Sequence, residues 1–457
     1  MMPAGIRFRL FPQAPFLHPG AEPETVWVSV PQGGIGPGPQ DRRMYVVDPI
    51  GKMQHYGIAQ LPNWASVPYL PPWDGPSRPP ALPDAGGNFD YLEPGTRQFE
   101  MSHLYGAVRF TLDVWERYFG RAISWHFSPP YERLEISLLR SVDNAFAGFG
   151  FLEAGAHVNE AGEYHPFSLN FDVVAHEVGH LIAFAEVGLP LPEMTEDEYY
   201  GFHESAADLV ALLTVLHFDS VVERLLETTR GNLYTLNELN RFAELSEDEE
   251  IRIAGNGRRM SEFAEGWMKE HELSEPLTGA LFDILVDIFH ESLLERRLVR
   301  PEVEDLADQV QRVPEYEPLV QALFDEAYAA NPGGFKEALL EARDYLGFAL
   351  AETWRRLPAE SLNYEDVASI LLGVERDLSG GRFARLMREN FLWREIGLVR
   401  VGPRLTTLGP DSHAASPRTM VPVPEPRSPR LSYRERWQLA RQHKRRMRDG
   451  EQAAPPG

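Results

Sequence analysis

The chain has 457 residues, of which 43% are hydrophobic and 25% are charged, as in an ordinary folded protein. This composition excludes a wholly disordered chain, a collagen-like repeat and a small disulfide scaffold. The sequence contains no cysteine, which excludes disulfides, thiolate metal ligands and a cysteine nucleophile. Its net charge of −24 disfavours nucleic acid as the main partner, because phosphate binding needs a basic surface.

The charge is unevenly distributed along the chain. Residues 402–457 contain eleven Lys and Arg against five Asp and Glu, a net charge of +6. We therefore expect any partner of this basic tail to be acidic. The first residues are interrupted by arginines and prolines and do not resemble a secretory signal, and no apolar run is long enough to span a membrane. A cytoplasmic location is expected.

The N-terminal third of the chain is predicted to be rich in strands. Short β-prone runs occur at 25–30 and 44–47, among many turn residues. Prolines crowd the segment 61–87, which is interpreted as an extended strap or a linker. Apolar residues then recur at helical intervals from about 102 to Gly120, and a β-type stretch follows at 134–139.

Helices dominate the rest of the chain. They are predicted at 172–187, 200–217, 276–298, 303–330, 334–357 and 364–393. The predicted fold class is α+β, with a strand-rich N-terminal subdomain at 1–170 and a mainly helical subdomain at 171–400. Residues 401–457, rich in Pro and Arg, are predicted to be disordered.

The most informative motif is His176-Glu177-Val178-Gly179-His180, an HExxH pattern within a predicted helix. Residues four apart on a helix lie one above the other, so the two imidazoles can share one metal ion. Glu177 would lie beside that ion, where it can take a proton from a water molecule. An HExxH match can arise by chance, so the surrounding sequence decides.

A hydrolytic zinc site needs three protein ligands and one open position. Ala183 and Glu186 stand where the pattern HExxHxxGxxH requires glycine and histidine, which excludes that arrangement. The segment GFHESAADLVALL offers Glu204 as the third ligand instead, with Asp208 one helical turn later. Apolar neighbours indicate that this helix is buried, and buried acids need partners. Asp208 could accept a hydrogen bond from a ligand imidazole and fix its tautomer.

The segment resembles the thermolysin-type branch of the gluzincin metallopeptidases. Asp172-Val173-Val174-Ala175 before His176 is similar to the family's DVVxHE lead-in. Asn144-Ala145-Phe146 resembles the NAF segment of the family's substrate-binding edge strand. An all-helical domain after the zinc site is also the family's layout. The resemblance covers roughly residues 100–360 and implies a zinc cleft between the two subdomains.

The resemblance implies a role for each matching residue. Zinc would be bound by His176, His180 and Glu204, with Glu177 as general base and Asp208 as support for a ligand. The implied substrate-binding residues are Asn144 and Ala145, which would hold the peptide backbone, and Val173, which would line the pocket for the residue after the scissile bond.

The sequence departs from the family at the residues that stabilise the oxyanion. His271 is the candidate histidine, with an exposed loop residue ahead of a helix as the alternative. Tyr200 is preferred over Tyr199 as the tyrosine, with a packing role at the helix start as the alternative. Calcium is not expected, because apolar residues replace most of the family's calcium ligands, and Asp172 is interpreted as a helix cap.

The predicted function is that of a zinc metallopeptidase that acts on peptides or unfolded proteins, with an endopeptidase preferred over an exopeptidase. Two alternatives stay open. One is a catalytically weak or inactive protein that keeps the fold and binds peptide, which the presence of Glu177 disfavours. The other is a hydrolase that uses the same zinc chemistry on a non-peptide amide.

Overall fold

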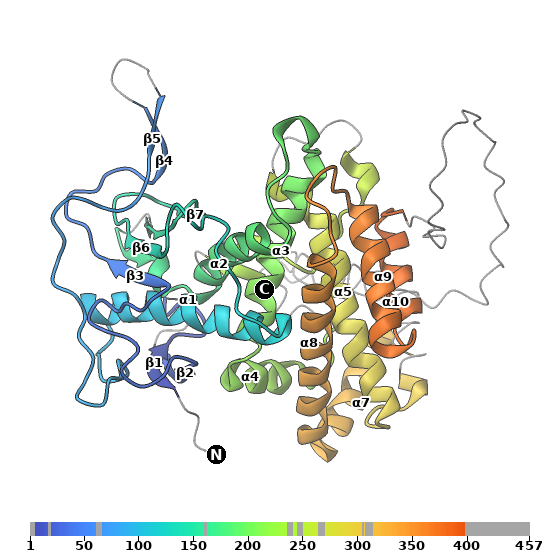
Figure 1. Ribbon diagram of the computed structural model, residues 1–457. Helices are drawn as coiled ribbons and strands as arrows, with labels where there is room; N and C mark the ends of the chain where they lie inside the picture. Colours follow the sequence, from blue (N-terminus) through green and yellow to red (C-terminus); the bar gives the residue numbers. More distant parts are fainter. Residues whose placement is uncertain are drawn as a thin grey trace, which may run out of the picture.

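The structure, a computed structural model, describes residues 5–16, 20–60, 66–159, 162–234, 241–244, 250–263, 270–303, 306 and 314–397 (Figure 1). The fold is mixed α+β, with a small sheet in the N-terminal part and helices in most of the rest. Residues 398–457, which include the basic tail predicted to be disordered, and residues 61–65 of the proline-rich segment lie outside the described residues.

The strands are short and most of them pair locally. They are β1 (Ile6–Leu10), β2 (Glu24–Val28), β3 (Met44–Val47), β4 (Gly57–Gln60), β5 (Ser66–Tyr69), β6 (Leu134–Leu138), β7 (Ala145–Gly148), β8 (Phe151–Ala154), β9 (Ala156–Val158), β10 (Tyr164–Pro166), β11 (Arg241–Glu244) and β12 (Glu250–Ile253). Four antiparallel pairs, β1–β2, β4–β5, β9–β10 and β11–β12, form two-stranded sheets.

The helices begin with α1 and gather in the C-terminal half. They are α1 (Arg97–Phe119), α2 (Phe171–Glu186), α3 (Asp197–Val215), α4 (Asp219–Thr229), α5 (Glu270–Glu295), α7 (Glu317–Ala330), α8 (Pro332–Trp354), α9 (Tyr364–Ser379) and α10 (Ala384–Trp393). The helices predicted around 172–187, 200–217 and 334–357 are confirmed to within a few residues, whereas α4 had no counterpart in the predicted elements.

The central sheet positions the strand that the sequence analysis singled out. Its strand order is β3-β6-β8-β7, in which β3, β6 and β8 run parallel and β7 pairs antiparallel with β8. Parallel neighbours require long connections, and here α1 lies between β3 and β6 in the chain. Strand β7 ends the sheet on the side of α2, and the two elements are in contact.

Helix α1 runs beneath the sheet and reaches the helical part (Figure 1). Its N-terminus is capped by Thr96, whose side chain accepts a hydrogen bond from the Phe99 N–H at 3.2 Å. Gly120 ends it in the left-handed conformation, with φ of 67°. The helix therefore starts one turn before the predicted position near Ser102. Trp115 on α1 stacks on Trp354 of α8, which joins the two parts of the core.

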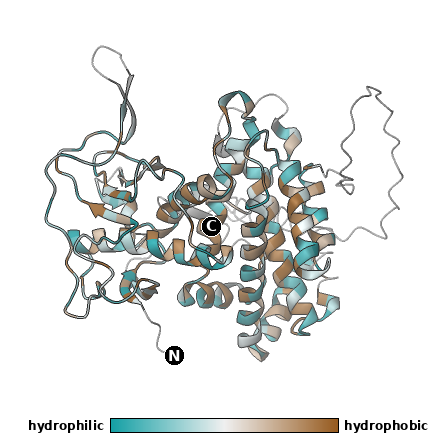
Figure 2. Cartoon of the chain, in the orientation of Figure 1, coloured by the Kyte–Doolittle hydropathy of each residue, from teal (hydrophilic) through white to brown (hydrophobic). Residues whose placement is uncertain are grey.

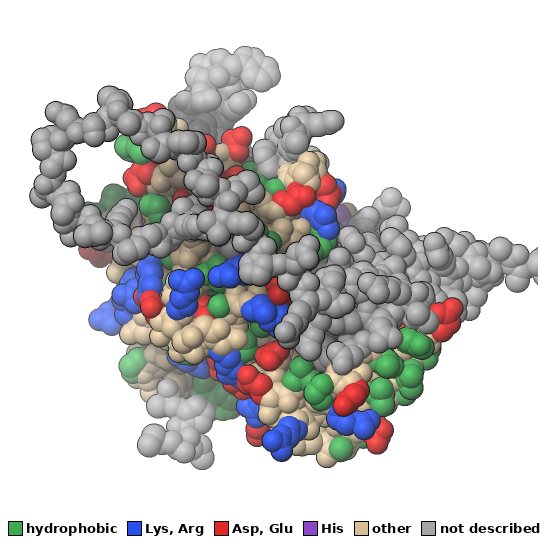
Figure 3. All heavy atoms as spheres, turned by 90° about the vertical axis from the view of Figure 1, so that its right-hand side faces the viewer, with side chains coloured by type: hydrophobic (Ala, Val, Ile, Leu, Met, Phe, Trp, Pro, Cys, Tyr) green, Lys and Arg blue, Asp and Glu red, His purple; other side chains and the backbone are tan. Residues whose placement is uncertain are grey.

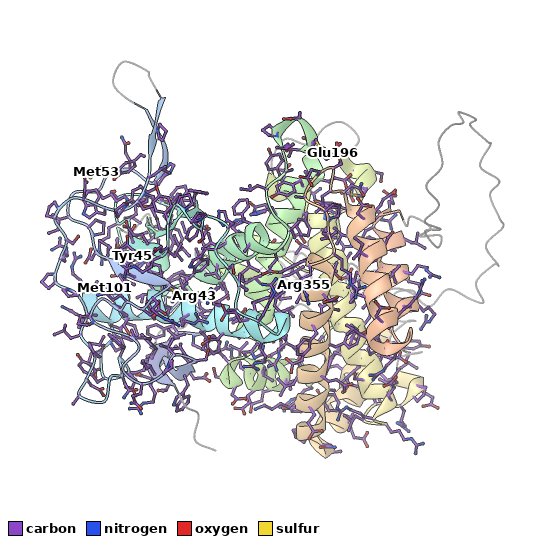
Figure 4. All side chains as sticks on the ribbon, viewed as in Figure 1. Arg43, Tyr45, Met53, Met101, Glu196 and Arg355 are labelled. Carbon is purple, nitrogen blue, oxygen red and sulfur yellow. The ribbon has the colours of Figure 1, made fainter. Side chains whose placement is uncertain are left out.

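A buried polar network ties residues 52–73 to the sheet. The Lys52 ammonium lies 2.6 Å from the Glu153 carboxylate and 2.9 Å from the centre of the Tyr56 ring. The Tyr56 hydroxyl and the Trp73 N–H donate to Glu135 at 2.7 and 2.9 Å. Every buried charge here has a partner, which keeps the cost of burial low. Figure 4 labels Tyr45 on β3, whose hydroxyl also donates to Glu135.

The proline-rich segment is ordered over its described part and only partly extended. Residues 66–69 form β5, which pairs with β4 as a hairpin. Beyond it, the Pro76 carbonyl accepts from the Ile50 N–H and the Ala81 carbonyl accepts from the Gly38 N–H. These contacts hold the segment against the N-terminal part of the chain.

The predicted single helix at 364–393 is wrong, because the structure breaks it into α9 and α10. Gly380 and Gly381 both have positive φ, at 74° and 100°, and Gly380 ends α9 in the left-handed conformation. Arg394, just after α10, is fully buried and donates 2.7 and 2.8 Å hydrogen bonds to Asp283 and Asn256. This arrangement anchors the end of α10 against α5.

Helix α5 also differs from the prediction, since it begins at Glu270 and contains Pro276 within it. Proline removes a backbone hydrogen bond from a helix interior. Two side chains donate to carbonyls beside it, Tyr364 to Leu273 at 2.6 Å and Asn256 to Glu275 at 2.7 Å. Within the predicted helix 303–330, the described residues Val303 and Leu306 are helical, and α7 begins at Glu317 after a 3₁₀ turn at Pro314–Tyr316.

The helices of the C-terminal half bury their apolar sides against one another. Figure 2 shows brown and teal sides on α5, α8 and α9, as expected for amphipathic helices packed side by side. On the face shown in Figure 3, basic and acidic side chains intermingle over the described residues. None of the described helices is long and apolar enough to span a membrane.

Candidate metal centre

Helices α2 and α3 carry the three predicted ligands and pack closely together. At their contact, a Cβ atom added to Gly179 would lie 2.5 Å from the Cα atom of Ala207, so only glycine fits. Helix α2 is capped by Asn170, whose side chain accepts from the Val173 N–H at 3.3 Å. Asp172 is therefore in the first turn of the helix and is not its cap, which corrects the expectation above.

His176, His180 and Glu204 form a group that could hold one metal ion, with all three ligand atoms within 4.8 Å of one another. The Nε2 atoms of His176 and His180 lie 3.5 and 3.7 Å from the two oxygens of Glu204. Tetrahedral ligands at zinc bond lengths of 2.0–2.2 Å are about 3.3–3.6 Å apart. His176 and Glu204 are buried, and His180 is half-buried. The donor set therefore fits such an ion.

The Nδ1 side of the His176 ring faces a buried acid. Its Nδ1 lies 3.0 Å from the Asp208 carboxylate, and Asp208 is only 2% exposed. Thr278 of α5 donates to the other oxygen of Asp208 at 3.4 Å. With Nδ1–H donating to Asp208, the Nε2 lone pair of His176 faces Glu204 and is available to a metal.

His180 is held by a residue that the sequence analysis missed. Its Nδ1 lies 2.8 Å from Nδ1 of His203, which precedes Glu204 on α3. Burial lowers the pKa of His203 to about 4, so this imidazole is neutral near pH 7. One feature of the sequence could have indicated this role: His203 is a polar residue directly before the ligand Glu204, in a helix of mostly apolar residues, FHESAADLVALL.

Strand β7 presents part of its backbone away from the sheet. The Asn144 carbonyl accepts from the Gly155 N–H at 3.0 Å, so it points toward the neighbouring strand. Backbone groups of successive residues in a strand point in opposite directions, so those of Ala145 and Ala147 face the open edge. The Asn144 side chain accepts from the Ala145 N–H at 2.9 Å. The structure therefore places Ala145 at the start of an edge strand beside α2 and Asn144 just before that strand, and Val173 is buried on α2 itself.

The remaining candidates are less closely defined by the structure. Glu177 is 8% exposed and follows His176 on α2. Tyr200 is 45% exposed, and none of the described hydrogen bonds or ion pairs links it to the three ligands. The hydroxyl of its neighbour Tyr199 donates to the Gly188 carbonyl at 2.7 Å and so supports the fold. Figure 4 labels Glu196, the residue just before α3, at the same end of the helix.

His271 belongs to the first turn of α5 and does not precede the helix as expected. Its side chain lies outside the described residues, so its role as oxyanion stabiliser stays a prediction.

Comparison with known proteins leaves the function to be argued from these residues. No family model matches the sequence, and no curated protein matches it either. Among solved structures, the chain is similar to the precursor of protealysin, a metalloproteinase from Serratia proteamaculans. The match has 12% sequence identity and a TM-score of 0.42, and it covers 71% of this chain and 83% of that chain.

Proposed function

We propose that the protein is a zinc-dependent metallopeptidase that hydrolyses peptide bonds. The observation that carries the proposal is the convergence of His176, His180 and Glu204 from two packed helices, and the buried residue Glu177 directly follows the first of them on α2. Two imidazoles and one carboxylate are a zinc donor set of the hydrolytic kind, which leaves a fourth position for water or substrate.

Zinc in this site would polarise a substrate carbonyl and lower the pKa of a water molecule. The protein's own side chains would transfer the proton and orient the ligands. Glu177 accepts the proton of the attacking water at its carboxylate and passes it to the leaving nitrogen. Asp208 and His203 keep the two ligand imidazoles in the tautomer that binds metal through Nε2.

The edge strand favours a peptide over a small amide as substrate. The outward carbonyl of Ala145 and the outward backbone groups of Ala147 can pair with an extended peptide, a recurring mode of peptide binding, whereas the Ala145 N–H already donates to the Asn144 side chain. An edge strand can pair with the middle of a chain as well as with its end, so we propose internal cleavage. Short peptides and unfolded segments are the expected substrates, because folded proteins seldom offer an extended segment free to pair.

The test combines metal content with cleavage of a peptide library. Elemental analysis should find one zinc per chain, and mass spectrometry should find internal cuts in a mixture of unstructured peptides. The Glu177→Gln variant should retain zinc and lose about 10²- to 10⁴-fold in kcat/KM, because it keeps the shape and removes the proton acceptor.

Glu186→Gln is the matched control, since Glu186 lies at the end of the same helix and pairs with Arg121. It should leave cleavage unchanged. A protein that takes up no stoichiometric zinc, or a Glu177→Gln variant as active as wild type, would overturn the proposal.

A further inference from the structure

We propose that the exposed ring of Phe149, together with Phe184 and His126, binds one apolar or aromatic side chain of an extended peptide. We call these three residues the aromatic surface. The inference rests on the proposed function and deepens it, because it names the class of peptide that the site selects. It concerns the end of β7, beyond the backbone groups that face the open edge of the sheet.

Phe149 lies in the turn between β7 and β8 and is 39% exposed. Three rings meet it edge-on, those of His126, Phe127 and Tyr131, with ring centres 5.8, 6.2 and 5.8 Å away. Contacts of this kind fix the orientation of a ring. Gly150, the next residue, has φ of 90°, and a Cβ atom there would lie 2.8 Å from the Tyr131 ring. The structure therefore holds a large apolar side chain at the surface in one orientation, which lowers the entropic cost of binding.

His126 joins this ring to the helix that carries two of the metal ligands. Its ring centre lies 4.9 Å from that of Phe184, which is half-buried on α2, one turn after His180. Burial lowers the pKa of His126 to about 4, so its ring is uncharged near pH 7 and suits an apolar neighbour. The aromatic surface thus reaches from the end of β7 to α2.

Strand β7 and helix α2 are in contact and run in the same direction (Figure 1). At their start, the Gly155 N–H donates to the Asn144 carbonyl just before β7, and the Gly155 carbonyl accepts from the Phe167 N–H shortly before α2. At their other end, the aromatic surface joins the turn after β7 to the second half of α2. A peptide paired with the open edge of β7 would therefore pass the metal ligands and then the aromatic surface.

The geometry of the two elements gives the spacing along such a peptide. Phe184 lies one turn after His180, which is about 6 Å along a helix axis. A strand advances by about 3.3 Å per residue, so the same distance corresponds to about two residues of an extended peptide. Side chains two residues apart lie on the same face of a strand. The aromatic surface should therefore select the side chain about two positions from the bond that is cut, on one side of that bond.

The chemistry of the aromatic surface favours phenylalanine, tyrosine, tryptophan or leucine at that position. An aromatic or aliphatic side chain would shield the exposed part of the Phe149 ring from water, and an aromatic one would add ring contacts. A charged side chain would lose hydration there and gain no opposite charge from these three residues, which are uncharged near pH 7.

The first measurement is a map of the cuts that the wild-type protein makes in a mixed library of unstructured peptides. Aligned cut sites should show apolar residues, aromatic ones above all, enriched about two positions to one side of the cut. For two peptides that carry Phe or Ala at that position, kcat/KM should differ by about tenfold or more, the usual effect of filling an apolar site. Phe149→Ala should reduce this ratio to about twofold or less.

A binding measurement separates the inference from the proposed function. The Glu177→Gln variant should bind peptide without cutting it. Fluorescence anisotropy should show that it binds a labelled peptide with one central Phe about tenfold more tightly than the Ala counterpart. Adding Phe149→Ala to this variant should remove the difference. Phe149→Gln removes the ring and keeps a long side chain, and it replaces the alanine variant if the melting temperature shows that the latter does not fold.

Phe348→Ala is the matched control. Phe348 is also an exposed phenylalanine, at 42%, and it meets the Tyr118 ring edge-on. It lies on α8, and its described ring contact is with α1, not with α2 or the central sheet. This control should leave the Phe-to-Ala ratio unchanged in cleavage and in binding.

Two results would overturn the inference. One is equal cleavage and equal binding of the Phe and Ala peptides, and the other is a ratio that neither Phe149→Ala nor Phe149→Gln changes. Both leave the proposed function intact, provided that the wild-type protein binds one zinc and cuts peptides. A protein that binds the Phe peptide more tightly but cuts no peptide would overturn the proposed function and leave the aromatic surface as a peptide-binding site.

Discussion

His176 and His180 differ in the side chains that hold their Nδ1 atoms, an anionic carboxylate in one case and a neutral imidazole in the other. A carboxylate raises the basicity of an imidazole ligand more than a neutral acceptor does. Asp208 is also more deeply buried than Glu204, at 2% against 7% exposed, and has Thr278 as a second partner. We therefore expect Asp208 to contribute more to metal affinity than His203.

Asp208→Ala should weaken zinc binding by about 10- to 100-fold, because His176 loses the acceptor that orients it. Asp208→Asn, which keeps an acceptor without the charge, should fall between the alanine variant and wild type. Competition with a chelator measures both. The surface variant Asp377→Ala on α9, which removes an ion pair with Arg356, is expected to behave as wild type. Unchanged affinity in Asp208→Ala would contradict the prediction.

The ligands themselves could be predicted from the sequence because their relation is local. His176 and His180 share a helix face by spacing alone, and Glu204 and Asp208 recur one turn apart on a second helix. The partner of His180 could not be predicted in the same way. His203 stands beside Glu204 in the sequence, yet only the packing of α3 on α2 brings its ring to His180.

At the scale of elements, the position of α3 relative to α2 depends on one glycine. Gly179 lies between the two histidine ligands in the sequence and faces Ala207 on α3 at the point of closest approach. A side chain at position 179 would collide with the backbone of Ala207, which cannot move unless the whole of α3 shifts. The distances between Glu204 and the two histidines depend on that same spacing.

Gly179→Ala should lower the free energy of unfolding by about 1–3 kcal/mol, as overpacking does, and also weaken zinc binding. Urea denaturation of zinc-free protein and chelator competition measure the two effects. Gly373→Ala is the control, since Gly373 lies inside α9 with nothing within 4 Å of an added Cβ. Its higher helix propensity should stabilise the protein by up to about 1 kcal/mol. A Gly179→Ala variant as stable as wild type would contradict the close approach.

Helices were predicted more accurately than their ends. Periodicity located α2, α3 and α8, but the break between α9 and α10 was missed although Gly380 and Gly381 marked it in the sequence. Pro276 was interpreted as the start of a helix, because the side chains of Tyr364 and Asn256 that support it come from distant segments. Long-range partners of this kind cannot be inferred from local patterns.

At the scale of the whole molecule, buried histidines join distant parts of the chain in their neutral form. His103 of α1 accepts from the Phe11 N–H at 2.9 Å and lies 2.8 Å from the Ser168 carbonyl, so it holds the N-terminal segment to the entry of α2. Burial lowers the pKa of His103 to about 4 and that of His217 to about 2. The order of strands β3-β6-β8-β7 depends on similarly distant contacts, which is why the sequence did not predict it.

The stability of the zinc-free protein should fall as the pH drops from 7 to 5. A histidine whose pKa is lower in the folded than in the unfolded state contributes fully to stability when the pH is above its unfolded pKa of about 6.5. It loses this contribution as the pH falls toward its folded pKa. For His103, the loss between pH 7 and pH 5 should be about 2 kcal/mol. Urea denaturation at the two pH values measures it in wild type and in His103→Gln. The same pH dependence in both proteins would show that His103 does not contribute.

A metal ion held between α2 and α3 would also act as a cross-link in a chain that has no cysteine. Such an ion binds the folded protein far better than the unfolded one, so a hundredfold excess of free zinc over the dissociation constant adds about 2.7 kcal/mol to stability. The half-life of the protein would then follow the zinc supply of its surroundings. A chain made without zinc would lack this added stability, so it would unfold and be degraded more often than the zinc-bound form.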